Sequence, residues 1–162
     1  MRERRAPERA TVPDDARALY DPGTVRSLFD EMAGTYGAVN LVSSLGFAAR
    51  WRHDAIAALP TAAGPRRRVA DLMAGMGELW RSLARLAPDV REVVAVDLSE
   101  EMLRRAVAPA GLAVTRRVED VLGTSLAPAT FDAVVSTFGL KTFDPEQQER
   151  LARLVADLLR PG

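Results

Sequence analysis

A turn with two glycines separates a short apolar run from an amphipathic stretch near the middle of the chain. It runs from Asp71 to Glu78, contains Gly75 and Gly77, and follows the apolar run 69–73. Glycine adopts backbone dihedrals that a Cβ disfavours, so the backbone of such a turn can approach a ligand closely. The pattern predicts a strand–turn–helix unit whose turn lies at the carboxyl edge of a parallel sheet, where open α/β sheets bind ligands.

Short apolar runs alternate with amphipathic stretches from this point onward, which is typical of βαβ units and a parallel sheet. We expect strands over 69–73, 92–98, 112–118 and 130–137, and helices over 78–87, from Ser99 toward Pro109, and over 145–159. Ser99 is the expected N-cap of the second of these helices. Asp144, Pro145 and Gln147 predict a capping box with proline at the first helical position of the third.

The chain before this region predicts a tail and a helical cap. Residues 1–20 contain few large apolar groups and are expected to form a mobile tail. Residues 21–64 are expected to form an N-terminal cap of two helices, and 65–162 a ligand-binding half-domain. The first helix should begin at Thr24 and end near Gly34 or Gly37, and the second should run from Phe47 to Leu59.

Composition excludes several classes of function. The 22 basic and 22 acidic residues give zero formal net charge, so no overall field favours nucleic acid or an anionic membrane. Without cysteine the chain has no disulfide, thiolate metal site or cysteine nucleophile, and we expect no metal site. The sequence has neither a signal peptide nor an apolar run of about 20 residues, and a cytoplasmic protein without a transmembrane segment is expected.

Two carboxylates extend the glycine turn into a candidate nucleoside site. Asp97 stands twenty positions after Gly77 at the end of the second expected strand, where it can accept both hydroxyls of a ribose. Asp120, after the third strand, could bind the exocyclic amine of adenine. The alternatives are a turn-capping role for Asp71, a helix-capping role for Asp97, and an ordinary loop position for Asp120.

The segment from Val25 to Gly162 resembles the class I S-adenosylmethionine-dependent methyltransferases, and within them the ubiquinone/menaquinone biosynthesis C-methyltransferases. The matching motifs are Val25 to Ala33 with Tyr36 and Asn40, Gly46 with Trp51, Asp71 to Gly77, Val96 to Leu103, Thr130 to Asp132, Phe138 to Leu140, and Leu159 to Gly162. The resemblance implies an α/β fold, a Rossmann-like three-layer αβα parallel sheet. It is incomplete here, with the first four strands and the N-terminal helical cap.

The resemblance also implies a cofactor, S-adenosyl-L-methionine, and the residues that bind it. Asp71, Gly75 and Gly77 would line its methionine and ribose side, Asp97 beside Leu98 would bind the ribose, and Asp120 with Val121 would bind adenine. Ser136 and Phe138 would face the sulfonium and the substrate. Tyr36, in the cap with Asn40, is a candidate contact to the methionine moiety.

The expected chemistry is transfer of a methyl group to a small aromatic, quinol-like or polyketide-like acceptor. This reaction requires no covalent intermediate. Alignment and exclusion of water are the main contributions of such a protein. No catalytic residue is assigned: His53, Asp132 or a water could take a proton, and His53 is expected to be a surface or packing residue. Packing roles are also expected for Phe29, Phe47 and Trp51, and a solvated loop position for Lys141.

The sequence departs from the family pattern in two places. Met73 and Met76 stand where the family has a small residue and a threonine, so the turn carries extra bulk. The family sheet has seven strands, and this chain ends where the fifth is expected, which leaves 131–137 with an unpaired edge. We therefore expect either that the sequence is a fragment or that a homo-oligomer or a complementing second chain covers this edge.

Two other functions stay open. One is a catalytically inactive methyltransferase-fold partner or regulatory subunit completed by another chain. The other is a nicotinamide-dependent oxidoreductase, which is disfavoured because Trp80 stands at the position of the third glycine in its dinucleotide-binding motif.

Overall fold

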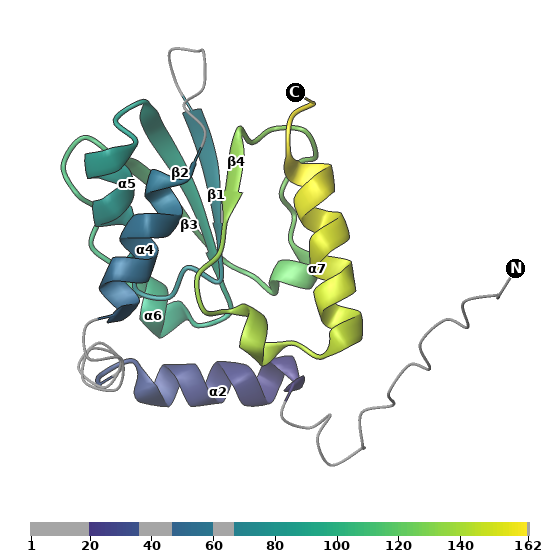
Figure 1. Ribbon diagram of the computed structural model, residues 1–162. Coiled ribbons are helices and arrows are strands. Elements are labelled where there is room, and N and C mark those ends of the chain that lie inside the picture. Colours follow the sequence, from purple (N-terminus) through teal and green to yellow (C-terminus); the bar gives the residue numbers. More distant parts are fainter. Residues whose placement is uncertain (1–19, 36–46, 60–66, 162) are drawn as a thin grey trace, which may run out of the picture.

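The protein forms a four-stranded parallel sheet with helices on both faces. The computed structural model describes residues 20–35, 47–59 and 67–161 (Figure 1). The strands are β1 (Arg67–Leu72), β2 (Val90–Asp97), β3 (Ala113–Val118) and β4 (Ala133–Val135), in the order β3-β2-β1-β4. Every neighbouring pair is parallel, as the alternation of apolar and amphipathic segments predicts.

The side chains of β1 alternate between two apolar cores. Val69 packs with α4 (Phe47–Ala57), α5 (Trp80–Leu86) and α6 (Glu100–Arg105) on one face of the sheet. Ala70 and Leu72 pack with α7 (Pro145–Leu158) on the other face. Figure 1 shows α4 and α5 on one side of the strands and α7 on the other. The predicted three-layer α/β architecture is therefore confirmed.

The starts of three helices are set by capping residues. Ser99 accepts a hydrogen bond of 3.1 Å from the Met102 backbone N–H at the start of α6, and Asp144 and Gln147 form the predicted capping box of α7. The helix α2 (Pro22–Met32) begins two residues before the expected Thr24, because Asp21 is its N-cap and Pro22 occupies its first turn. α2 ends at Met32, α4 ends at Ala57, and α6 ends well before Pro109.

The strand expected over 130–137 is much shorter in the structure. β4 pairs with β1 at only three positions, 133–135. Phe131 forms a separate parallel bridge with Leu159, and Phe138 has a positive φ of 66° that is incompatible with a continuing strand. The apolar sequence indicated a longer strand because it contains no information on this change in backbone direction.

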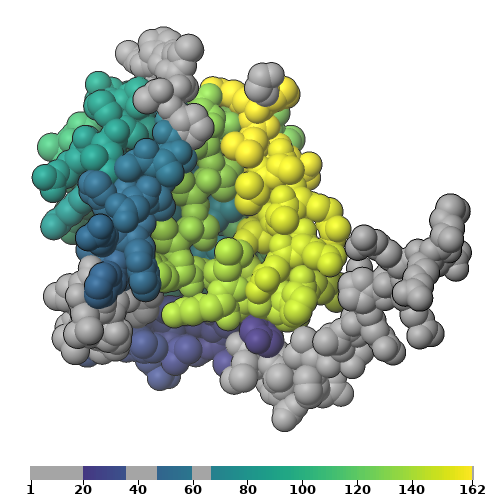
Figure 2. Space-filling model, viewed as in Figure 1, coloured from purple at the N-terminus to yellow at the C-terminus, as the bar shows by residue number. Residues whose placement is uncertain are grey.

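The helix α2 lies across one end of the sheet (Figure 1). It contacts α6, and the Ser99 Oγ donates a hydrogen bond of 2.5 Å to Asp30 Oδ1 of α2. In the space-filling view, the green segment that contains β4 lies at the surface between α4 and α7 (Figure 2). No helix in the described residues is long and apolar enough to span a bilayer.

Candidate functional site

A cavity opens at the carboxyl edge of the sheet. The loops that follow all four strands contribute to its wall, together with α2 and one side chain of α4. The space between these walls is about 910 Å³, a volume that includes the open solvent at its mouth. Among the expected site residues, its lining includes Gly75, Asp97, Leu98, Asp120, Val121 and Phe138.

The glycine turn and Asp97 are joined directly. Gly75 donates its backbone N–H to Asp97 Oδ2 at 2.7 Å, and the Ser99 backbone N–H donates to Oδ1 at 2.9 Å. Burial raises the pKa of Asp97, and these two hydrogen bonds oppose that rise. Gly75 has a φ of 55°, and the nearest atom to a Cβ built there is Glu78 Oε2 at 3.7 Å. The turn is therefore held against Asp97, and no side chain at Gly75 stands between the backbone of the turn and a ligand.

Asp120 lies beside the same cavity at the end of β3. It caps the short helix η2 (Val121–Gly123), and its Oδ1 accepts a hydrogen bond of 3.0 Å from the Leu122 backbone N–H. Val121 is buried at the start of η2. A carboxylate has about four acceptor positions on its two oxygens, so this cap leaves acceptor capacity toward the cavity that Asp120 lines.

Asp71 and Gly77 belong to the turn but do not line the cavity. Asp71 is fully buried, and its Oδ2 accepts a hydrogen bond of 2.8 Å from the Trp80 indole. Burial raises the pKa of Asp71 to about 7, against the lowering effect of the Trp80 bond, and the negative charges of Asp97 and Glu78 add to the rise. Gly77 has a φ of 70°, and a Cβ there would lie 2.5 Å from the Trp80 ring.

Other expected residues lie away from the cavity or outside the described chain. Ser136 is absent from the lining, and its buried Oγ has no hydrogen-bond partner, whereas the next two residues, Thr137 and Phe138, do line the cavity. His53, Asp132 and Lys141 do not line it either. Tyr36 and Asn40, like the tail 1–19, lie outside the described residues.

Two expected packing residues are exposed. Phe47 and Trp51 are 52% and 56% exposed, and their ring centroids are 6.2 Å apart. Trp51 in turn lies 6.1 Å from the ring of Phe138. The expected packing role is therefore wrong for these two, because the buried face of α4 is formed instead by Ala48, Arg52 and Ile56.

The sequence interpretation missed two charged residues of the wall, Arg52 and Glu78. Arg52 occupies the buried stripe of α4, at four-residue spacing from Ala48 and Ile56. A cation on an apolar helical stripe is a signal that could have identified it. Glu78 ends the glycine turn, directly after Gly77, and the glycines were the stronger signal at this place in the sequence.

Met73 and Phe138 share an unusual backbone conformation. Their φ angles are 58° and 66°, in the left-handed region that residues with a Cβ rarely adopt, and both line the cavity. Strain of this kind gathers at functional sites. The bulk of Met73 thus borders the space that a ligand would occupy.

Comparison with known proteins shows the family. Residues 69–162 match the family described as "Methyltransferase domain". The chain is 36% identical over 144 residues to the demethylmenaquinone methyltransferase of Thermobifida fusca, covering 86% of this chain and 57% of that protein. It is 35% identical over 147 residues to the ubiquinone/menaquinone biosynthesis C-methyltransferase UbiE of Syntrophotalea carbinolica, covering 88% of this chain and 60% of that protein.

A solved structure agrees with the fold. Magnesium protoporphyrin IX methyltransferase from Synechocystis PCC 6803, solved with bound SAH, superposes with a TM-score of 0.67 at 21% identity, covering 86% of this chain and 68% of that one. The chain spans less than two thirds of the two curated relatives' lengths. It belongs to the methyltransferase-domain family, and its resemblance to the class I S-adenosylmethionine-dependent methyltransferases is confirmed.

Proposed function

We propose that this chain binds S-adenosylmethionine and takes part in methyl transfer to carbon of a small aromatic, quinol-like acceptor. The observation that carries the proposal is the convergence of Gly75, Asp97 and Asp120 on one cavity. The demethylmenaquinone and ubiquinone/menaquinone methyltransferases among its relatives support the acceptor class.

The residues present fit the cofactor. Asp97 would hold the ribose hydroxyls through the lone pairs that Gly75 and Ser99 leave free. Asp120 and the backbone of Val121 would hold the adenine. Gly75 presents backbone without a side chain to the ligand, and its nearest neighbour in the direction of a Cβ is 3.7 Å away.

The cofactor supplies a methyl group on a positively charged sulfur. The chain contributes alignment of the reacting groups and exclusion of water, which need no covalent intermediate. Phe138 and Met73 border the cavity at the ends of β4 and β1, and their side chains would exclude water from the methyl group. No side chain of the described cavity wall is proposed as a general base.

The acceptor side of the proposal rests on a row of exposed aromatic rings, Phe47, Trp51 and Phe138. Consecutive centroids are 6.2 and 6.1 Å apart, and the row begins at the cavity wall with Phe138. Aromatic side chains left this exposed commonly mark binding surfaces. The row would contact the ring or the apolar extension of a planar acceptor as it enters the cavity.

Isothermal titration with S-adenosylhomocysteine tests the cofactor part of the proposal. Wild-type chain is expected to bind, and Asp97→Asn is expected to weaken binding about tenfold, since a good charged hydrogen bond contributes about 1.4 kcal/mol or more. Asp54→Asn, on the exposed side of α4, is the matched control and should bind as wild type. Absence of binding by the wild type would refute the proposal.

Transfer of a labelled methyl group from S-adenosylmethionine to a demethylated quinol tests the acceptor part. Trp51→Ala is expected to raise KM for the acceptor several-fold and to leave the affinity for S-adenosylhomocysteine unchanged, because Trp51 does not line the cavity. An unchanged KM would remove the aromatic row from the proposal.

A second candidate function is that of a methyltransferase-fold subunit completed by another chain or by a second copy. The outer edge of β4 supports it: in the described residues this edge pairs only through the bridge from Phe131 to Leu159. Unpaired strand edges readily add a further strand. Sedimentation of the purified chain distinguishes the candidates, since a stable monomer that binds S-adenosylhomocysteine would argue against a subunit role.

A further inference from the structure

A second hollow lies at the surface between α4 and α5. The two helices pack against each other on one face of the sheet (Figure 1). The hollow has a volume of about 400 Å³, which includes open solvent. It shares no lining residue with the cavity at the carboxyl edge, and it is lined by His53 of α4 and by Arg81, Ser82, Arg85 and Leu86 of α5.

The α5 side of the hollow is a polar stripe with two cations. Trp80 and Leu83 are the buried residues of α5. Arg81 and Arg85 are exposed and stand four residues apart, so they lie next to each other on one face of the helix. The helix contains no acidic residue that could separate their charges.

The two arginines repel each other, because like charges four residues apart on a helix are destabilising. Neither has an ion-pair or hydrogen-bond partner among the described residues. Each guanidinium carries five N–H donors and no acceptor. An anion between Arg81 and Arg85 would therefore remove the repulsion and accept hydrogen bonds from both.

His53 reaches the same hollow from the other helix. Its Nδ1 lies 3.3 Å from Asp54 Oδ1, and Asp54 Oδ2 lies 3.8 Å from Arg50 Nε. The charge of Asp54 is thus shared with two groups of α4, on its own helix. The second ring nitrogen of His53, Nε2, keeps hydrogen-bonding capacity for a ligand in the hollow.

A phosphate group fits this set of donors better than a carboxylate does. Guanidinium groups donate paired hydrogen bonds to phosphate oxygens, and a phosphate ester offers three strong acceptor oxygens. The Ser82 hydroxyl can donate a further hydrogen bond. A carboxylate has only two oxygens for the donors of Arg81, Ser82, Arg85 and His53.

We propose that the hollow between α4 and α5 binds the phosphate group of a small molecule. Arg81 and Arg85 hold its oxygens from α5 together with Ser82, and His53 holds it from α4. This site is separate from the cavity of the proposed methyl transfer and does not depend on that proposal.

Titration of the full chain with inorganic phosphate, followed by amide NMR, tests the inference. Sodium chloride keeps the ionic strength constant. The wild type is expected to bind with a Kd of about 1 mM or below, with shifts confined to α4 and α5. Arg81→Gln and Arg85→Gln should each weaken binding about tenfold, the loss expected for one charged hydrogen bond.

Three further measurements make the test specific. His53→Gln should also weaken phosphate binding, and it removes the donor of the other helix. Arg153→Gln changes the net charge equally at an exposed position of α7, across the sheet, and should bind phosphate as the wild type does. Arg81→Gln should keep the wild-type affinity for S-adenosylhomocysteine, because Arg81 does not line the cavity.

The outcomes separate this inference from the proposed function. Equal weakening by Arg153→Gln, or shifts spread over both faces of the molecule, would show unspecific screening and overturn the phosphate site. Binding to phosphatidylglycerol vesicles without saturable binding of free phosphate would show a membrane-contact surface and also overturn it. A chain that binds phosphate here and does not bind S-adenosylhomocysteine supports the site and refutes the proposed function alone.

Discussion

The Trp80 indole donates a hydrogen bond of 2.8 Å to Asp71 Oδ2 beneath the glycine turn. The bond explains why a carboxylate can stand in β1 on the same face as Val69, which packs against α5. Asp71 is fully buried, so this hydrogen bond only partly offsets the loss of water from a charged carboxylate. The pair fixes the start of α5 below the turn.

The first prediction concerns Asp71→Asn and pH. The pKa of Asp71 is raised from 3.8 to about 7 in the folded protein. Between these values the unfolded chain is ionised and the folded chain keeps its proton, so wild-type stability falls as pH rises. Asparagine does not ionise and still accepts from Trp80. The free energy of unfolding of Asp71→Asn, relative to wild type, should therefore rise by about 3 kcal/mol between pH 5 and pH 8.

Urea unfolding at the two pH values measures this difference. Asp54→Asn, which removes an exposed carboxylate, is the control for the loss of an aspartate in general. Stability curves of Asp71→Asn and wild type that run parallel from pH 5 to pH 8 would contradict the raised pKa.

The second prediction compares the two glycines of the turn. Both have positive φ, but a Cβ on Gly77 would lie 2.5 Å from the Trp80 ring, whereas the nearest neighbour of a Cβ on Gly75 is at 3.7 Å. Gly77→Ala should destabilise the protein by about 3 kcal/mol, combining strain and overpacking. Gly75→Ala should cost about 1 kcal/mol from the backbone alone. Chemical denaturation of both variants measures the difference, and equal losses would show that Trp80 can move aside.

Elements with local signals were predictable from the sequence. The capping box of Asp144 and Gln147, the cap Ser99, and the parallel alternation all depend on residues close together in the chain, and each is present in the structure. The position of Gly75 beside Asp97 was also predictable although the two are 22 positions apart, because the ends of adjacent parallel strands meet at one edge of the sheet.

Features that depend on tertiary contacts were not predictable. The length of β4 is limited by its pairing with β1 and by the bridge from Phe131 to Leu159. Gly77 looks equivalent to Gly75 in the sequence, and only the position of the Trp80 ring assigns it to packing beneath the turn. The burial of Arg52 and the exposure of Trp51 depend on the rotation of α4 about its axis, which its mixed sequence specifies weakly.

The third prediction concerns the contact between Met73 and Gly139 at the cavity wall. A Cβ on Gly139 would fall against the Met73 sulfur and within 2.8 Å of its Cβ. Gly139→Ala should cost about 2 kcal/mol through overpacking. In a Met73→Gly background the same substitution should cost under about 1 kcal/mol, because the contact is gone. A double-mutant cycle of unfolding free energies measures the coupling, and additive losses would show that the two residues do not compete for space.

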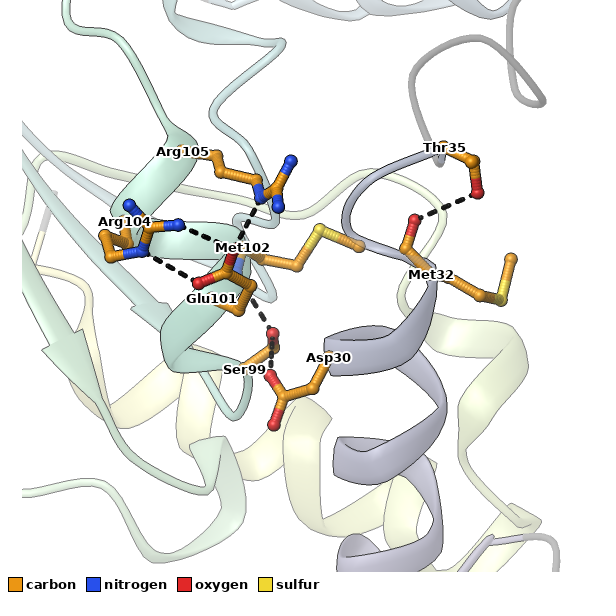
Figure 3. A network of polar contacts seen from close by, with 8 residues as sticks. All are labelled: Asp30, Met32, Thr35, Ser99, Glu101, Met102, Arg104 and Arg105. Carbon is orange, nitrogen blue, oxygen red and sulfur yellow. Dashed lines mark hydrogen bonds and ion pairs between the residues drawn. The ribbon is translucent and has the colours of Figure 1, made fainter.

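The fourth prediction concerns the attachment of α2 to the sheet (Figure 3). Ser99 Oγ donates to Asp30 of α2 and accepts from the Met102 backbone, while the Ser99 backbone N–H donates to Asp97. One residue therefore links the helix across the cavity, the cap of α6 and the proposed ribose carboxylate. Asp30→Ala removes the acceptor on α2 and should leave α6 and Asp97 in place.

Hydrogen exchange resolves this effect by element. Loss of one part-buried hydrogen bond of about 1 kcal/mol should speed exchange in α2 about fivefold, with no change in α7, which packs on the opposite face of the sheet. Glu31→Ala, at the neighbouring exposed position of α2, controls for the change in helix composition. Since α2 also contributes to the cavity wall, Asp30→Ala should weaken binding of S-adenosylhomocysteine as well. Faster exchange spread evenly over α2, α6 and α7 would show a global loss of stability and argue against a local attachment through Ser99.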